Sequence, residues 1–135
     1  MIPKFRAWLK REKKMVDVEG LEFVGGKLYN IRCKINGLMS FCLALFVLMQ
    51  STGVKDKKGA EIFEGDIIEH RYNSPLSGEL VVHRFQVAWD EMYSRFCTIG
   101  IGLRHGVDLS SSACSHHFEV IGNIYENPEL LEEVD

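Results

Sequence analysis

The stretch Leu48–Ile68, LMQSTGVKDKKGAEIFEGDII, holds a turn, a returning strand and the entry to a further strand in fixed order. Asp56 and Gly59 bracket two lysines as Asp and Gly bracket a type I turn, in which the Asp side chain caps the backbone. Ala60–Phe63 is then expected to return as a short extended segment. The stretch therefore predicts a tight reversal between two strands.

The same stretch continues into a second change of direction at Gly65 and Asp66, directly before the β-branched pair Ile67-Ile68. We predict that Gly65 holds a positive φ or a bulge, because glycine adopts both without steric cost. Asp66 is expected to accept hydrogen bonds from nearby backbone amides. The neighbouring glutamates alternate with apolar residues and are assigned to the solvent face: Glu61, Glu64 and Glu69.

Upstream, short apolar and polar alternations predict a β-meander. Phe5–Leu9 is the first expected strand, Arg11–Lys14 a charged turn, and Met15–Gly20 the second strand. A pair of glycines able to take positive φ separates two further short strands, Glu22–Val24 and Lys27–Ile31.

Downstream, strands follow one another at the short spacing of an SH3-like barrel. The expected strands are Ile67–Tyr72, Leu80–Trp89, Arg95–Ile101 and Phe118–Tyr125. Asn127-Pro128-Glu129 is typical of a helix start, with Asn as cap and Pro at the first helical position. The prediction is a mostly β single domain over residues 1–135: an N-terminal meander packed on a small barrel over about Thr52–Tyr125, a subdomain seam near Ser51–Gly53, and a short C-terminal helix.

Three segments carry a resemblance to a known family. They are Lys4–Trp8 followed by Lys13-Lys14-Met15, then Met49–Ile68, and finally Val120–Leu131. In this order they resemble the YopX family of phage and prophage proteins. The resemblance implies a mostly β protein of the bacterial cytoplasm with no established activity, and it supplies no catalytic residues. Between Arg71 and Phe118 the chain matches the family only in general character.

The composition is that of a globular protein of 135 residues, with 46% hydrophobic and 26% charged residues. The net charge of −3 argues against a non-specific electrostatic grip on nucleic acid. Four cysteines without CxxC spacing and no signal peptide predict reduced thiols. The apolar run Leu38–Met49 is too short for the roughly 20 residues of a membrane span, so it is expected to lie in the core, with a strand from Phe46.

One cluster has soft metal-ligand character: Cys114-Ser115-His116-His117, with His105 upstream. A second ligand pair is missing, so we predict neither a structural metal nor a cofactor. Metal analysis of dialysed, untagged protein is expected to find no stoichiometric zinc. Zinc that survives dialysis, and whose chelation destabilises the fold, would contradict this prediction. A nucleophilic pairing of Cys97 or Cys114 with a histidine is expected by chance among four cysteines and five histidines, so no catalytic residue is assigned.

The N-terminal segment is the candidate for nucleic-acid binding, because it joins phosphate-seeking charge to aromatic surface. Its residues are Lys4, Arg6, Trp8, Lys10, Arg11, Lys13 and Lys14. A solvated strand face and turn is the preferred interpretation, since the whole chain is acidic and hairpin turns often collect lysines. The sequence thus predicts a non-enzymatic phage or prophage accessory protein that acts through protein contacts and forms a homo-oligomer; a small nucleic-acid-binding module is the alternative.

Overall fold

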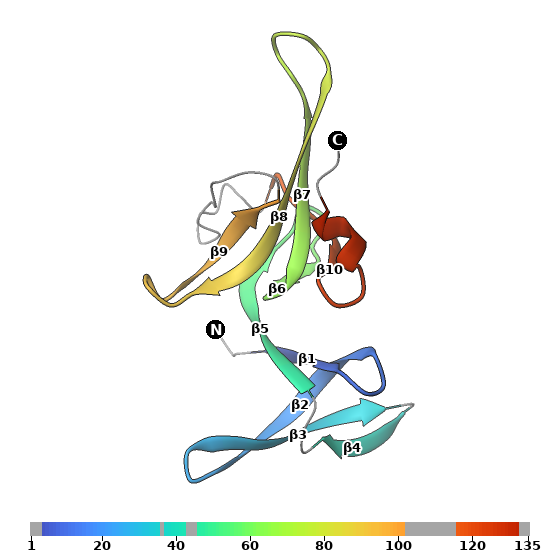
Figure 1. Cartoon of the computed structure of the whole chain (residues 1–135), viewed down its shortest axis with the longest axis vertical. Coiled ribbons are helices and arrows are strands. Elements are labelled where there is room, and N and C mark those ends of the chain that lie inside the picture. The colour runs from blue at the N-terminus through green and yellow to red at the C-terminus, as the bar shows by residue number, and fades with distance from the viewer. Residues whose placement is uncertain (1–3, 36, 43–45, 102–115, 133–135) are drawn as a thin grey trace. The chain divides into compact units, whose positions relative to one another are not determined.

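A computed structural model describes residues 4–35, 37–42, 46–101 and 116–132, and these residues are mostly β-strand (Figure 1). The expectation of a mostly β protein is confirmed. The chain divides into two compact units, Met1–Ser51 and Thr52–Asp135. Each unit is built from antiparallel strands.

The first four strands of the first unit form a meander, as predicted, and the fifth pairs with the first rather than with the fourth. The strands of this unit are β1 (Phe5–Leu9), β2 (Lys14–Val24), β3 (Lys27–Ile35), β4 (Leu38–Cys42) and the first half of β5 (Phe46–Lys55). They lie in the order β4-β3-β2-β1-β5, so β1 is paired on both sides. The second half of β5 belongs to the second unit, where it neighbours β6 (Glu61–Phe63).

The predicted strand end at Gly20 is wrong, because β2 continues to Val24 as one strand. A shift in register between Val18 and Gly20 lets the strand pass without a turn. A Cβ at Gly20 would lie 3.2 Å from Arg32 Nε, so glycine suits this close approach. The glycine pair Gly25-Gly26 has φ of 59° and 81° and closes the β2–β3 hairpin as expected.

Alternation along the strands builds the core of the first unit. Ala7 and Leu9 on β1 point to the same side and are fully buried. They pack in one cluster with Val16, Ile31 and Cys33 from the two following strands. Neither Cys33 nor the half-buried Cys97 of the second unit is in a disulfide.

The apolar run Leu38–Met49 divides between exposed and buried positions. Leu38 and Met39 on β4 are 73% and 45% exposed, whereas Met49 on β5 is buried. The strand expected from Phe46 is confirmed. Residues 43–45 lie outside the described ranges. In the part of the chain that the structure describes, no helix is long and apolar enough to span a bilayer.

The second unit contains a four-stranded sheet in the order β10-β7-β8-β9. Its strands are β7 (Asp66–Asn73), β8 (Leu80–Asp90), β9 (Arg95–Gly100) and β10 (Glu119–Asn123). β7 and β8 form a long hairpin that extends well past the rest of its unit (Figure 1). One side of this hairpin, here called its inner face, packs into the second core cluster: Ile62, Ile68, Phe85, Val87 and Phe118.

Two expectations for this unit are not met. The SH3-like barrel is not confirmed, since the described sheet is open and ends at β10 and β9. Strand spacing predicts the number of strands but not closure, which needs hydrogen bonds between first and last strands. The C-terminal helix is only a 3₁₀ turn, Pro128–Leu131. Asn127 does not cap it with its side chain, because its Oδ1 accepts from Asn123 N instead (3.3 Å).

Candidate interaction sites

Asp56 confirms the predicted turn and does more than cap it. Gly59 N donates to Asp56 O at 3.0 Å, and Gly59 has φ of 86°. Asp56 Oδ1 accepts from the amides of Lys58 and Ala60 at 2.9 and 2.8 Å. Its other oxygen, Oδ2, accepts from Val120 N at 3.0 Å. One buried carboxylate therefore joins the β5–β6 turn to strand β10.

The charge of Asp56 is stabilised by this arrangement. Burial by itself would raise the pKa of Asp56, but the hydrogen bonds from the Val120, Ala60 and Lys58 amides outweigh it, so the pKa is lowered. The turn is also tied to β10 by Lys57 N donating to Phe118 O at 2.9 Å. Lys58 Nζ adds an exposed ion pair to a Glu119 oxygen at 2.7 Å.

The second change of direction is confirmed in the same way. Gly65 has φ of 88° and is buried. Its N–H donates to Val87 O at 2.8 Å, and its carbonyl accepts from Ile124 N at 2.9 Å. Asp66 is 1% exposed, and its Oδ2 accepts from Phe63 N at 2.8 Å, as predicted. The turn thus contacts strand β8 and the segment after β10.

The basic N-terminal residues are distributed over one strand and one turn. Arg6 and Trp8 occupy alternate positions of β1, so they share one face of the strand, and Lys4 directly precedes it. The other four are exposed, three of them in the β1–β2 turn and the last as the first residue of β2: Lys10, Arg11, Lys13 and Lys14. Trp8 and Arg6 are half-buried, which reduces the aromatic surface that a nucleobase could stack on.

Histidines gather where the sequence did not indicate it. His70 and His83 face each other across β7 and β8, and the ring of His117 lies 5.3 Å from that of His70. Burial lowers the pKa of His70, with further contributions from His117, His83 and Lys57. Cys114 and His105 lie outside the described residues. Within the described ranges, no three His, Cys, Asp or Glu side chains are grouped to hold a metal ion.

The opposite side of the β7–β8 hairpin, its outer face, carries a charged triad that sequence reasoning missed. Glu69 was assigned to the solvent face, and this is wrong: it is 7% exposed. Its Oε2 accepts from Arg84 Nε at 3.0 Å, and its Oε1 accepts from Arg71 Nε. Glu69 and Arg71 are two residues apart on β7, and Arg84 is the cross-strand partner of Glu69. The spacing of Glu69 and Arg71 can be read from the sequence. The strand register that places Arg84 opposite Glu69 cannot.

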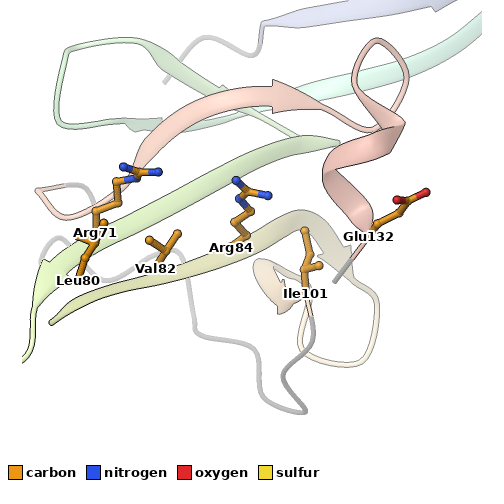
Figure 2. Close-up of a pocket in the computed structure, with 6 residues that line it drawn as sticks. All are labelled: Arg71, Leu80, Val82, Arg84, Ile101 and Glu132. Atoms are coloured by element: carbon orange, nitrogen blue, oxygen red, sulfur yellow. The ribbon is translucent and has the colours of Figure 1, made fainter. Parts of the chain in front are cut away.

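Both arginines line a pocket of about 330 Å³ (Figure 2). We call it the two-arginine pocket, and its lining residues are Arg71, Leu80, Val82, Arg84, Ile101 and Glu132. Arg71 and Arg84 rise from neighbouring strands on the same side, and Glu132 lies beyond Ile101, away from Arg71 (Figure 2). Ile101 is held beside β8 because its N–H donates to Arg84 O at 2.9 Å.

Strand β4 offers a second kind of surface. It lies at one end of its sheet, so in the described residues its outer edge has no strand partner. Leu38 and Met39, opposite Ile35 and Lys34 of β3, leave apolar side chains exposed at this edge. An exposed apolar edge strand is a ready template for pairing with another chain.

The comparisons with known proteins agree with this fold. The family model described as YopX protein matches residues 4–132. The chain belongs to the YopX family. Among solved structures, protein EF1440 from Enterococcus faecalis is 32% identical, with a TM-score of 0.62 and coverage of 98% of this chain and 99% of that one. None of the curated proteins matches the chain.

A second solved structure, protein yopX from Bacillus subtilis, is 18% identical and covers 98% of each chain with a TM-score of 0.66. At that identity the likeness shows the fold alone. In this YopX-family chain, the segments that carry the family resemblance build turns: Asp56 and Gly65 in the central segment, and Asn123 in the closing one. Asn123 Oδ1 accepts from the amides of Tyr125 and Glu126 at 3.0 and 2.8 Å. These residues stabilise turns of the fold. Most residues of the two-arginine pocket lie outside the family segments, between Arg71 and Ile101.

Proposed function

We propose that the protein is a non-enzymatic phage or prophage accessory protein that acts through protein contacts and assembles with copies of itself. The exposed apolar edge of β4 carries this proposal. Pairing of two such edges would satisfy their backbone N–H and C=O groups and cover Leu38 and Met39. A two-fold arrangement brings the same strand from both copies together, which is the commonest form of homo-oligomer.

Light scattering on size-exclusion fractions across a concentration series tests the assembly. We expect the wild type to form a dimer or larger species, and the variant Leu38→Glu/Met39→Glu to be monomeric, because the added charges at the edge repel each other and resist burial. Leu76→Glu is the matched control. Leu76 is 98% exposed in the β7–β8 turn, so this variant should assemble like the wild type.

The variant must be folded for this result to count. Circular dichroism should therefore show a cooperative thermal transition for all three proteins, with equal midpoints for the wild type and the control. The midpoint of the double variant should be lower only by the stabilisation that assembly adds. A wild-type protein that stays monomeric at high concentration would contradict assembly.

Binding measurements on the same samples distinguish the assembly proposal from the alternative, a nucleic-acid-binding module. Reversing the charges of Lys13 and Lys14, both exposed, should leave assembly unchanged. Under the assembly proposal neither the wild type nor this variant should bind single-stranded or duplex DNA. A monomeric protein whose DNA affinity falls steeply with salt and is lost on this reversal would favour the nucleic-acid module instead.

A further inference from the structure

We propose that the two-arginine pocket binds a small amphiphilic oxyanion, that is, a carboxylate or phosphate group carried on an apolar chain. The site lies on the outer face of the β7–β8 hairpin, in the second unit. It does not depend on the assembly edge at β4, which belongs to the first unit. The two proposals therefore stand or fall separately.

The two guanidinium groups of the pocket offer hydrogen-bond donors to an anion. A guanidinium carries five N–H donors, and in both Arg71 and Arg84 it is Nε that donates to Glu69. Among the described residues, the terminal nitrogens of these two arginines have no partner. Two adjacent guanidiniums with their terminal N–H groups available match the oxygens of a carboxylate or phosphate.

The charges at the pocket also favour an anion. Glu69 is buried and needs a cationic partner, and the Arg84 side chain, only 23% exposed, supplies one. The Arg71 side chain is 53% exposed and adds a second positive charge beside the first. One carboxylate neutralises one guanidinium, so the triad keeps a net positive charge. An incoming anion would relieve the repulsion between the two arginines.

The apolar lining of the pocket defines the part of the ligand that carries no charge. Leu80 and Val82 are 59% and 38% exposed beside the arginines, on alternate positions of β8. Covering them with an alkyl or aromatic group would contribute roughly 25 cal/mol per Å². The volume of about 330 Å³ is at the small end for ligand pockets.

Glu132 sets a limit on the charge of the ligand. It lines the pocket beyond Ile101, away from Arg71 (Figure 2). A second anionic group at that end would be repelled. We therefore expect a ligand with one anionic head at the arginines, and a linear dicarboxylate should bind more weakly than a monocarboxylate of equal length.

Titration calorimetry with simple probes tests this site on the full chain. Hexanoate and hexyl phosphate are the two head-group arms, and acetate and hexylammonium are the comparisons. We expect at least one hexyl anion to bind about tenfold more tightly than acetate, because its methylenes cover Leu80 and Val82. Hexylammonium should not bind. The stronger of the two hexyl anions identifies the head group.

Variants then assign the binding to the pocket. Arg71→Gln should weaken the hexyl anion about tenfold, the loss of one charge-assisted contact, while leaving the Arg84–Glu69 pair in place. Arg95→Gln removes the same charge from β9, outside the pocket, and should bind like the wild type. Leu80→Ser should reduce the preference for the hexyl anion over acetate. The variant Arg84→Gln is avoided, because it removes the less exposed partner of Glu69.

Two results would overturn the proposal. One is that no anionic probe binds at millimolar concentration to folded wild-type protein. The other is that Arg71→Gln, with an unchanged thermal midpoint, binds the hexyl anion as tightly as the wild type does. The first result would leave the assembly measurement unaffected, since that measurement reports on β4.

Discussion

Replacing Asp56 by alanine should lower the free energy of unfolding by about 2–4 kcal/mol, because charge-assisted hydrogen bonds contribute more than neutral ones. The variant leaves three amides without their acceptor, those of Lys58, Ala60 and Val120. Urea denaturation at pH 7 measures the loss. Lys58→Gln is the control, since it keeps the three amide hydrogen bonds and removes only the exposed Lys58 charge, which pairs with Glu119 and attracts Asp56. It should change stability by less than about 1 kcal/mol.

The contribution of Asp56 should also depend on pH. Its pKa in the folded protein is below the ordinary value of 3.8, so folding favours the charged form. This stabilisation is fully present well above pH 3.8, and it is lost as the pH falls through that value towards the lower folded-state pKa. The difference in stability between wild type and Asp56→Asn should therefore shrink on acidification below about pH 4. A difference that stays constant from pH 7 to pH 3 would contradict this role of the carboxylate.

Gly65→Val should cost roughly 1–3 kcal/mol of stability, because a β-branched residue is strained at φ of 88°. Gly65 is also buried and hydrogen-bonded through both N–H and C=O, so the backbone has little freedom to relax. Gly78→Val is the matched control for strain without burial, since Gly78 has φ of 74° and open space around its Cα. It should cost less, because the exposed turn can rearrange. Equal denaturation midpoints for Gly65→Val and wild type would count against the assignment.

Local chemistry was predicted well from the sequence where a short motif decides the structure. The Asp56 turn, the positive φ at Gly65 and the Gly25-Gly26 hairpin each follow from the residue type at one or two positions, although Asp56 and Gly65 also make long-range hydrogen bonds. Each is a position where one residue type is strongly preferred by backbone geometry. Such preferences can be read without knowing which strands pair.

Features that depend on strand pairing could not be predicted. Gly20 was taken as a strand end, although a register shift carries β2 past it. Glu69 was taken as exposed, because the pattern on β7 alone does not show that Arg84 lies opposite. The expected barrel failed for the same reason, since closure is a property of the whole sheet. The two-arginine pocket combines residues from β7, from β8, from the segment after β9 and from the segment after the 3₁₀ turn Pro128–Leu131, so no single stretch of sequence predicts it.

The bond between Asp56 and Val120 joins residues 64 positions apart, and this has a consequence for how the chain acquires its structure. In the first unit β1 pairs with β2, β2 with β3 and β3 with β4, so these hairpins can form as the polypeptide leaves the ribosome. In the second unit the β5–β6 turn lacks a partner for Asp56 Oδ2 until residue 120 has been synthesised. Strand β7 likewise waits for β10 to cover one of its edges. The two units should therefore mature at different times during translation, the first one well before the second.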